Sequence, residues 1–331
     1  MLGQDRGDGD DSRHLGIVTP LGAPRASGKG DDYGGGMARA AVRSPGTGSG
    51  RSPWPLLSGL TLACHPGPTV VVTVLGTALA AAVGAEPTTT ALLAVAVLTG
   101  QLSVGWSNDW LDAGRDRAVD RASKPVVSGL VSAATLRRAA WGALVVCVVT
   151  SLATGIVPGV VHLAAVASAW GYNLGLKSTP WSWLPYAVSF ALLAEFAVLV
   201  APGDRLAAPW TLAAAALLGT GAHVANTLPD LDDDAATGVR GLPHRLGRRA
   251  SGVLAPTLLV AAVGVVVAGP GGPPSAAAWA GGLLAATLAA AAGAVALTRV
   301  SSRAPFGLSM AVAVVCVVVL ALAVPEVAVR R

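Results

Sequence analysis

Four polar residues recur at intervals of four at the end of one apolar run. They are Asn108, Asp112, Asp116 and Asp120. If the run forms a helix that continues past its apolar part, steps of four residues drift by only about 40° each, so these side chains share one face. Carboxylates at this spacing repel one another and destabilise an isolated helix. We therefore expect a positively charged group to lie against this face.

A second series with the same spacing lies in the later half of the chain. It consists of Asn226, Asp230, Asp234 and Gly238. Like the first series, it begins with an asparagine inside an apolar run and is followed by basic residues and a proline. We interpret the two series as an internal duplication in which two equivalent helices offer carboxylates to one shared site.

The residue types of the two series indicate a particular ligand chemistry. Carboxylate and amide oxygens select hard cations, and Mg²⁺ is usually held by one or two carboxylates together with phosphate oxygens of a substrate. Arg121 and Lys124 follow the first series and Arg245 follows the second. Such cations would balance the remaining charge of a phosphate group. The sequence therefore predicts a site for a diphosphate held through Mg²⁺.

The elements that position these residues are predicted to be membrane-spanning helices. Hydrophobic residues make up 53% of the chain, charged residues only 12%, and the mean hydropathy is +0.61, which is the composition of a membrane protein. Runs of about 17 to 25 apolar residues can cross a hydrocarbon core of roughly 30 Å as helices. Alternating barrel segments are absent from the sequence. We predict an all-α integral membrane protein of about nine spans, namely 68–85, 91–110, 139–156, 159–176, 183–201, 208–226, 252–269, 276–298 and 305–325.

Two features of the sequence shape this assignment. Residues 157–159, Val-Pro-Gly, would separate the third span from the fourth, because proline and glycine end a helix and permit a tight return. The stretch 1–52 is rich in Gly, Asp, Arg and Ser and has no apolar run. We predict that residues 1–52 are a disordered extension and that residues 53–331 form the membrane domain.

The basic residues predict the orientation. Arginine or lysine is present after the second, fourth, sixth and eighth spans, whereas the opposite connections carry only Glu86, Asp204 and Arg205 as charged residues. The positive-inside rule then places the N-terminus and both acidic series in the cytoplasm. The terminal Arg330 and Arg331 conflict with this orientation, because it places them on the side opposite the cytoplasm. The basic residues of these connections account for most of the net charge of +5, so we predict no nucleic-acid partner. The high content of Ala, Val and Gly is typical of a high-GC bacterium, in which the host membrane would be the plasma membrane.

The acidic series also resemble known motifs. NDWLDAGRD resembles the NDxxDxxxD motif of the UbiA superfamily of intramembrane prenyltransferases, and DLDDD resembles its second motif, DxxxD. Three further segments agree with this family: RASKPVVSG at 121–129, YNLGLKSTP at 172–180 and ATGVRGLPHRLG at 236–247. The resemblance covers about residues 52–325. Two departures are Gly241, where the family usually has threonine, and His65, near which many members carry an arginine.

The resemblance implies a UbiA-like helical bundle and a reaction that requires Mg²⁺. In it, an allylic isoprenyl diphosphate donor loses diphosphate within the lipid bilayer. Its carbon passes to a lipophilic acceptor, often an aromatic ring or a quinone precursor. Ionising such a donor requires that the charge developing on the leaving group be stabilised, and metal ions and positioned cations achieve this.

The resemblance further implies roles for individual residues. Metal ligands would be Asn108, Asp112, Asp116, Asp230 and Asp234. The four aspartates of this set and Lys177 would be the catalytic residues, with Lys177 on the diphosphate. Further substrate contacts would come from Arg121, Lys124, Tyr172 and Asn226. Tyr172 could orient either Lys177 or the acceptor.

Other residues are candidates because of their predicted surroundings. Glu195 is the only acid well inside a predicted span, and ionisable residues there are functional candidates. It could contact the acceptor or accept a proton, or it could be neutral and hydrogen-bonded between helices. His223 is a candidate acceptor contact. Trp106 and Trp110 could stabilise an allyl cation, although tryptophan near helix ends is more often an interfacial anchor.

Three other functions have to be weighed. A membrane metal-ion transporter would hold its acids near the midplane along a pathway, whereas these acids lie at one face. A CDP-alcohol phosphotransferase also uses clustered aspartates, but in one continuous motif without a second site far downstream. A UbiA-type terpene cyclase shares the ionisation step, so the sequence alone does not separate it from a transferase.

Overall fold

The computed structural model of the protein describes residues 54–299 and 301–330. The described residues group by their contacts into one unit. The extension predicted to be disordered, residues 1–52, lies outside the described residues.

The described chain is built almost entirely from helices. The long ones are α2 (Pro66–Ala82), α3 (Pro87–Ala118), α4 (Ala133–Ala153), α5 (Ile156–Leu174), α6 (Leu184–Leu199), α7 (Pro209–Thr227), α9 (Leu242–Ala268), α10 (Ala276–Thr298) and α11 (Ala304–Leu322). The short ones are α1 (Trp54–Ala63), η1 (Leu176–Ser178), η2 (Leu228–Asp230), α8 (Leu231–Ala236) and α12 (Val324–Val327). Strands β1 (Arg205–Ala207) and β2 (Ala328–Arg330) pair antiparallel, with Leu206 opposite Val329.

Within the described residues, each long helix coincides with one predicted span, although the helix ends differ by several residues. One predicted boundary was wrong. The turn between α4 and α5 lies at Thr154 and Gly155, where Gly155 has φ 127°, and not at residues 157–159. Pro158 instead occupies the first turn of α5, where its missing N–H would have had no helical partner.

Not every long helix is apolar enough to be a membrane span on its own. Length and hydropathy select α3, α4, α9, α10 and α11 among the described helices, and α1 with α2, bent by 61°, could form a sixth span. The helix α6 is shorter, with 16 residues, and α5 and α7 contain histidine and asparagine residues that lower their hydropathy. The fold is therefore that of a multi-pass membrane protein, and the crossing of all nine long helices stays a prediction.

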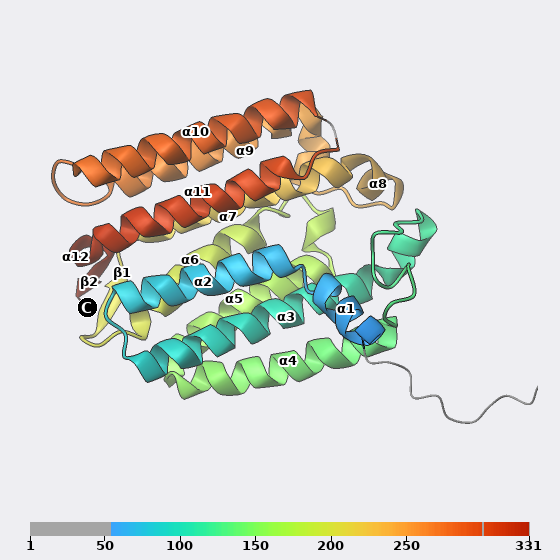
Figure 1. Ribbon diagram of the computed structural model, residues 1–331, viewed down its shortest axis with the longest axis horizontal. Helices are drawn as coiled ribbons and strands as arrows, with labels where there is room; N and C mark the ends of the chain where they lie inside the picture. The colour runs from blue at the N-terminus through green and yellow to red at the C-terminus, as the bar shows by residue number, and fades with distance from the viewer. Residues whose placement is uncertain (1–53, 300, 331) are drawn as a thin grey trace, which may run out of the picture. The chain divides into compact units, whose positions relative to one another are not determined.

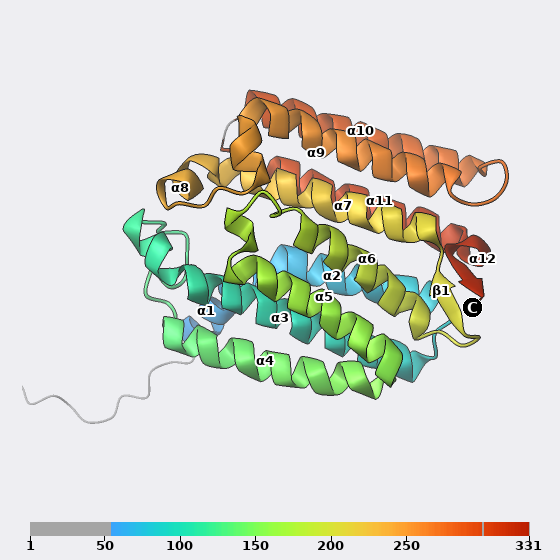
Figure 2. The ribbon, with the colours of Figure 1, turned by 180° about the vertical axis from the view of Figure 1, so that it is seen from behind.

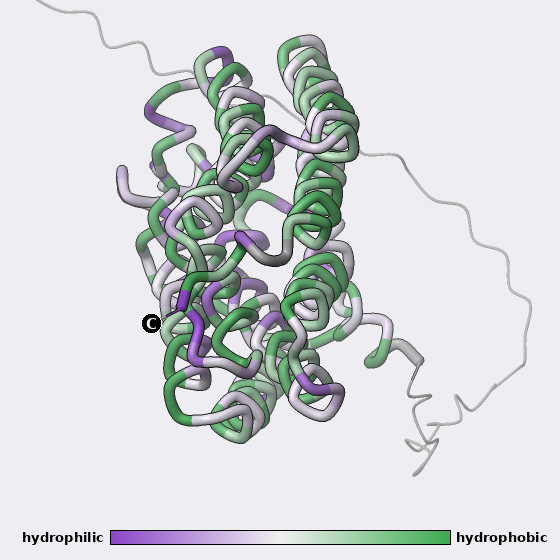
Figure 3. Tube along the Cα trace, turned by 90° about the vertical axis from the view of Figure 1, so that its left-hand side faces the viewer, coloured by the Kyte–Doolittle hydropathy of each residue, from purple (hydrophilic) through white to green (hydrophobic). Residues whose placement is uncertain are grey.

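The long helices run side by side, with their connections gathered at two ends. Figures 1 and 2 show α1, α8 and the segment after α3 at one end, and β1, β2 and α12 at the other. In Figure 3, which looks along the helices, most helical turns are green or white. The outer faces are apolar as well, since the side chains of Val149 on α4, Leu283 on α10 and Leu322 on α11 are exposed. Such faces are suited to lipid.

The interior is close-packed toward the β1 end. Leu93, Phe196, Leu259 and Val312 are fully buried in one cluster, to which α3, α6, α9 and α11 each contribute one of these residues. Near the opposite end, α3 approaches the break between α1 and α2 so closely that a Cβ atom at Gly105 would lie 2.8 Å from the carbonyl oxygen of Cys64. The bundle therefore holds the break, and with it the α1 end, against α3.

Candidate active site

The first acidic series lies on a helix that continues past its apolar part. Helix α3 has 32 residues and ends at Ala118, so Asn108, Asp112 and Asp116 share one helical face as predicted. Asp120 does not join them, because it lies beyond the helix in the left-handed conformation with φ 48°. The series on the helix therefore has three members and not four.

The second series is interrupted. Helix α7 carries Asn226 and ends at Thr227, after which the chain passes through η2, containing Asp230, to α8, containing Asp234. Pro229 lies at the interruption, and proline both lacks an N–H and clashes with the carbonyl four residues earlier in a continuous helix. The prediction of two equivalent helices was therefore wrong in this respect. The second set of carboxylates lies on a bent segment.

Lys177 is the first cation that the fold places on the acids. Its side chain is only 6% exposed, and its Nζ donates to both carboxylate oxygens of Asp112 at 2.6 Å and to Asn108 Oδ1 at 3.3 Å. Arg115 also binds Asp112 from within α3. Burial lowers the pKa of Lys177 below its usual value, and the Asp112 carboxylate acts in the opposite direction. A buried cation therefore faces the first series, as the repulsion between its carboxylates predicted.

Arg121 connects the two series. Its Nη2 donates to Asp234 Oδ1 at 2.7 Å and its Nη1 to Asp116 Oδ1 at 3.3 Å. Burial alone would raise the pKa of Asp234, but contact with His244 and the charge of Arg121 outweigh it, so this pKa lies below its usual value. One guanidinium thus brings together carboxylates that are far apart in the sequence. Asp230 is more peripheral and pairs with the exposed Arg303 at 3.4 Å.

Asp109 is a member of this region that the spacing argument missed. It is 1% exposed, accepts a hydrogen bond from Lys124 Nζ at 2.7 Å and lies 3.2 Å from His65 Nε2. Lys124, expected to contact substrate, is therefore engaged with this buried carboxylate. Asp109 follows Asn108 directly and lies off the face defined by steps of four, and only its place in the NDxxDxxxD motif could have revealed it.

Some predicted site residues lie elsewhere or have other partners. Glu195 accepts a hydrogen bond from the backbone N–H of Ala207 in β1, at the end opposite the acids, so it is not brought into the cluster. Trp106 donates from Nε1 to the carbonyl of Leu60 in α1 and anchors that helix. Tyr172 does lie near the acids, within reach of the charges of Asp234 and Asp112, and Asn226 lies one turn before Asp230.

The acids do not form a closed metal site by themselves. Within residues 54–299 and 301–330, no three side chains of His, Cys, Asp or Glu are grouped closely enough to hold a metal ion. The carboxylates carry basic partners instead, namely Lys177 on Asp112 and Arg121 on Asp116 and Asp234. The aspartates and Asn108 offer oxygen atoms, which is the donor type that Mg²⁺ takes.

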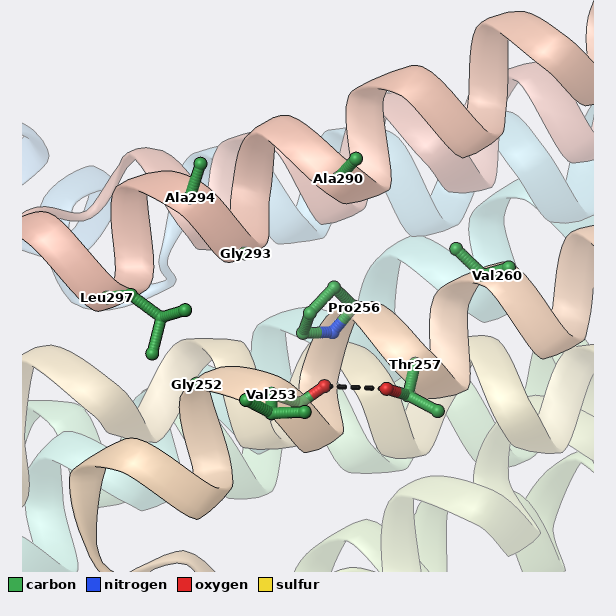
Figure 4. A pocket seen from close by; sticks show the side chains of 9 residues that line it. All are labelled: Gly252, Val253, Pro256, Thr257, Val260, Ala290, Gly293, Ala294 and Leu297. Atoms are coloured by element: carbon green, nitrogen blue, oxygen red, sulfur yellow. Dashed lines mark hydrogen bonds between the residues drawn. The ribbon is translucent and has the colours of Figure 1, made fainter.

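A separate hollow of about 400 Å³ lies between α9 and α10. Figure 4 shows its lining, in which Pro256 faces Gly293 and the Thr257 hydroxyl donates to the carbonyl of Val253 in its own helix. None of its lining residues is charged. This hollow therefore offers no group that could bind a diphosphate, and it is distinct from the acid cluster.

The fold and this cluster can be compared with known proteins. A family model described as the UbiA prenyltransferase family matches residues 69–311. The chain belongs to the UbiA prenyltransferase family. No curated protein matches it by sequence.

Solved structures agree with the UbiA assignment at the level of the fold. The apo structure of a UbiA homolog from Aeropyrum pernix K1 matches with a TM-score of 0.63 and 20% identity, over 77% of this chain and 98% of that one. A UbiA homolog from Archaeoglobus fulgidus bound to GPP and Mg²⁺ matches with a TM-score of 0.61 and 14% identity, over 79% and 99%. A digeranylgeranylglyceryl phosphate synthase structure matches with a TM-score of 0.56 and 17% identity, over 82% and 99%. This UbiA family member therefore has the full helical bundle of its structural relatives.

Proposed function

We propose that the protein is a Mg²⁺-dependent prenyltransferase that moves an isoprenyl group from an allylic isoprenyl diphosphate to a lipophilic acceptor, an aromatic compound or a quinone precursor. The observation that carries this proposal is that Arg121 pairs with an acid of each series, Asp116 and Asp234, while Lys177 pairs with Asp112. Two sets of oxygen ligands at one end of the helices could bind a metal ion, and the two cations beside them could bind the oxygens of a diphosphate. The structural relative bound to GPP and Mg²⁺ supports this reading.

The residues present fit Mg²⁺ in their donor chemistry. Asn108, Asp112, Asp116, Asp230 and Asp234 would hold it together with the diphosphate oxygens. When bound, Mg²⁺ stabilises the negative charge that develops on the leaving diphosphate. Lys177 and Arg121, which now neutralise the carboxylates, would then bind diphosphate oxygens.

The reaction follows from that arrangement. The bond between C1 of the donor and its oxygen breaks, and both electrons leave with the diphosphate. The acceptor supplies the electron pair for its new bond to C1 and releases a proton. Lys177 and Arg121 stabilise the negative charge of the leaving diphosphate. The apolar helices keep water away from the allyl cation.

We also propose that all nine long helices cross the plasma membrane, with the acidic motifs and the N-terminus in the cytoplasm. The distribution of basic residues supports this orientation. The bilayer is then a partner of the protein, and the isoprenyl tail lies among helices that border lipid.

The test uses the purified full-length protein in lipid nanodiscs with Mg²⁺ and a panel of isoprenyl diphosphates. Diphosphate release and prenylated products are followed with and without an extract of bacterial lipids and quinone precursors. Asp234→Asn should remove both activities, whereas Asp232→Asn, at a neighbouring acid with an 89% exposed side chain, should retain them. A cyclic product formed without the extract would move the protein to the cyclases, and no release from any donor would overturn the proposal.

A further inference from the structure

Three aromatic rings from three helices meet just inside the acid cluster. They belong to Tyr172 at the end of α5, Tyr186 near the start of α6 and His223 in α7. The ring centres are 5.2 Å apart for Tyr172 and Tyr186, 5.6 Å for Tyr172 and His223, and 4.7 Å for Tyr186 and His223. We call these three residues the aromatic cluster. It lies at the same helical end as Lys177, which follows Tyr172 in the next turn of the chain.

A chain of hydrogen bonds connects His223 to the start of α9. The backbone N–H of Leu242 donates to Ser182 Oγ at 2.9 Å, and Ser182 Oγ lies 3.1 Å from His223 Nε2. Within the described residues, His223 Nε2 is the one acceptor in reach of the Ser182 hydroxyl proton. In the tautomer in which Ser182 donates to Nε2, this proton has an acceptor and the neutral ring carries its own proton on Nδ1.

Gly241 permits this arrangement. A Cβ atom at this position would lie 2.6 Å from the carbonyl oxygen of Lys177 and 2.7 Å from Ser182 Oγ. Any larger residue would therefore push Ser182 away from Leu242 and from His223. The departure from the usual threonine of the family motif coincides with the segment that fixes His223.

One polar atom of the aromatic cluster lacks a partner. His223 is 1% exposed, and its Nδ1 is buried without a hydrogen bond among the described residues. Buried polar groups in proteins are nearly always hydrogen-bonded, so an unpaired group calls for an explanation. His223 Nδ1 is such a group, and its place between two tyrosine rings beside the predicted diphosphate site indicates a missing polar ligand.

We propose that the aromatic cluster binds the acceptor and that His223 Nδ1 donates a hydrogen bond to an oxygen atom of its ring substituents. This inference rests on the proposed transferase function and names the residue that selects its second substrate. The two tyrosine rings provide flat surfaces on which an aromatic acceptor can stack. To reach His223 Nδ1, the acceptor displaces one of the two tyrosine rings. Ser182 acts as a positioning residue, because it keeps the proton of His223 on Nδ1.

The experiment compares acceptors that differ by one hydroxyl group. Full-length protein in nanodiscs receives Mg²⁺ and geranyl diphosphate, with 4-hydroxybenzoate against benzoate and 2-naphthol against naphthalene as acceptor probes. His223→Leu should raise the KM for the hydroxylated probes at least about tenfold, as expected for the loss of one buried hydrogen bond. His223→Asn places an amide N–H near the former Nδ1 and should restore most of the affinity.

A matched control separates this role from packing. His162 is also buried and lies 2.7 Å from a serine hydroxyl, that of Ser151, but on the part of α5 away from the acids. His162→Leu should leave the acceptor KM unchanged, and thermal unfolding in detergent reports the stability of all variants.

The outcomes are distinguishable from a failure of the proposed function. Release of diphosphate without an acceptor reports ionisation alone, and it is measured for the unmodified protein and for every variant. An unchanged acceptor KM in His223→Leu would overturn the inference and leave the transferase standing. Diphosphate release without prenylation of any hydroxylated probe would overturn it as well, whereas absence of release from the unmodified protein would overturn the proposed function itself.

Discussion

Individual residues gain their roles here from the partners that the fold gives them. Lys177 is far from Asp112 in the sequence, yet its Nζ lies 2.6 Å from both carboxylate oxygens in a buried setting. Removing one partner of a buried charge pair leaves the other uncompensated. A buried lysine needs a negatively charged partner. In this structure the partner of Lys177 is Asp112, and in the proposed reaction it is the diphosphate.

Replacement of Lys177 should therefore affect the donor more than the acceptor. Lys177→Met keeps most of the side-chain volume and removes the charge. We expect the KM for geranyl diphosphate to rise by at least about tenfold, because a charge-assisted hydrogen bond contributes roughly 1.5–3 kcal/mol. Steady-state kinetics with each substrate varied in turn measures this. The exposed Arg303 provides the control, since Arg303→Met should change the KM much less.

The residues that sequence spacing predicted are those on a regular helix. Asn108, Asp112 and Asp116 share a face because α3 continues to Ala118. Asp109 was missed because its importance comes from long-range contacts with His65 and Lys124, which no local spacing reveals. Glu195 looked functional because it is an acid in an apolar run, yet it accepts a hydrogen bond from β1 at the far end.

At the scale of elements, close approach between segments decides what each position tolerates. The tail segment around Gly241 packs against η1, and a Cβ at Gly241 would lie within 2.7 Å of two polar atoms. Contacts that short do not occur without displacement of the neighbouring backbone. The segment that positions Lys177 and the segment that begins α9 are thus fitted to each other.

Restoring the threonine typical of the family should therefore be harmful in this chain. Gly241→Thr is expected to destabilise the protein by about 1–3 kcal/mol, the usual cost of overpacking, and to reduce activity by displacing Ser182. Thermal unfolding and diphosphate release measure the two effects. Gly264→Ala, in α9 where a Cβ meets nothing within 4 Å, should be neutral or stabilising because alanine favours the helix. Full activity of Gly241→Thr with an unchanged melting temperature would contradict the packing argument.

The elements themselves were largely predictable from apolar runs, and their interruptions were not. The second acidic series breaks at Pro229 into η2 and α8, although its spacing matched a continuous helix. The turn before α5 lies at Gly155, because glycine tolerates φ 127°, while Pro158 continues the helix. Proline thus marked a helix end in one case and a helix start in the other.

At the scale of the whole molecule, the charged residues of the candidate site gather at one end of the described unit. The acids, Lys177 and Arg121 lie at the α8 end, and β1 with β2 lies at the other (Figure 1). The positive-inside argument predicted this separation from loop charges alone. Hydropathy did not establish the number of spans, since α5, α6 and α7 do not qualify by themselves.

Orientation can be measured with single cysteines. Cys64, Cys147 and Cys316 are buried, so they give little background. Ser128→Cys, in the exposed connection between α3 and α4, should react with a membrane-impermeant maleimide in inverted vesicles, and Gly271→Cys, between α9 and α10, should react in intact spheroplasts. The opposite labelling pattern would reverse the predicted topology.

The central claim is that both aspartate series serve one Mg²⁺–diphosphate site. Calorimetric titration of geranyl diphosphate into the protein in nanodiscs, with Mg²⁺ or with EDTA, tests it most directly in the unmodified protein and in Asp112→Asn, Asp234→Asn and Asp232→Asn. We predict binding that requires Mg²⁺, that is lost when either Asp112 or Asp234 is changed, and that persists in Asp232→Asn, whose acid is exposed. Binding that is equally tight with EDTA, or that survives the loss of one series, would contradict the claim.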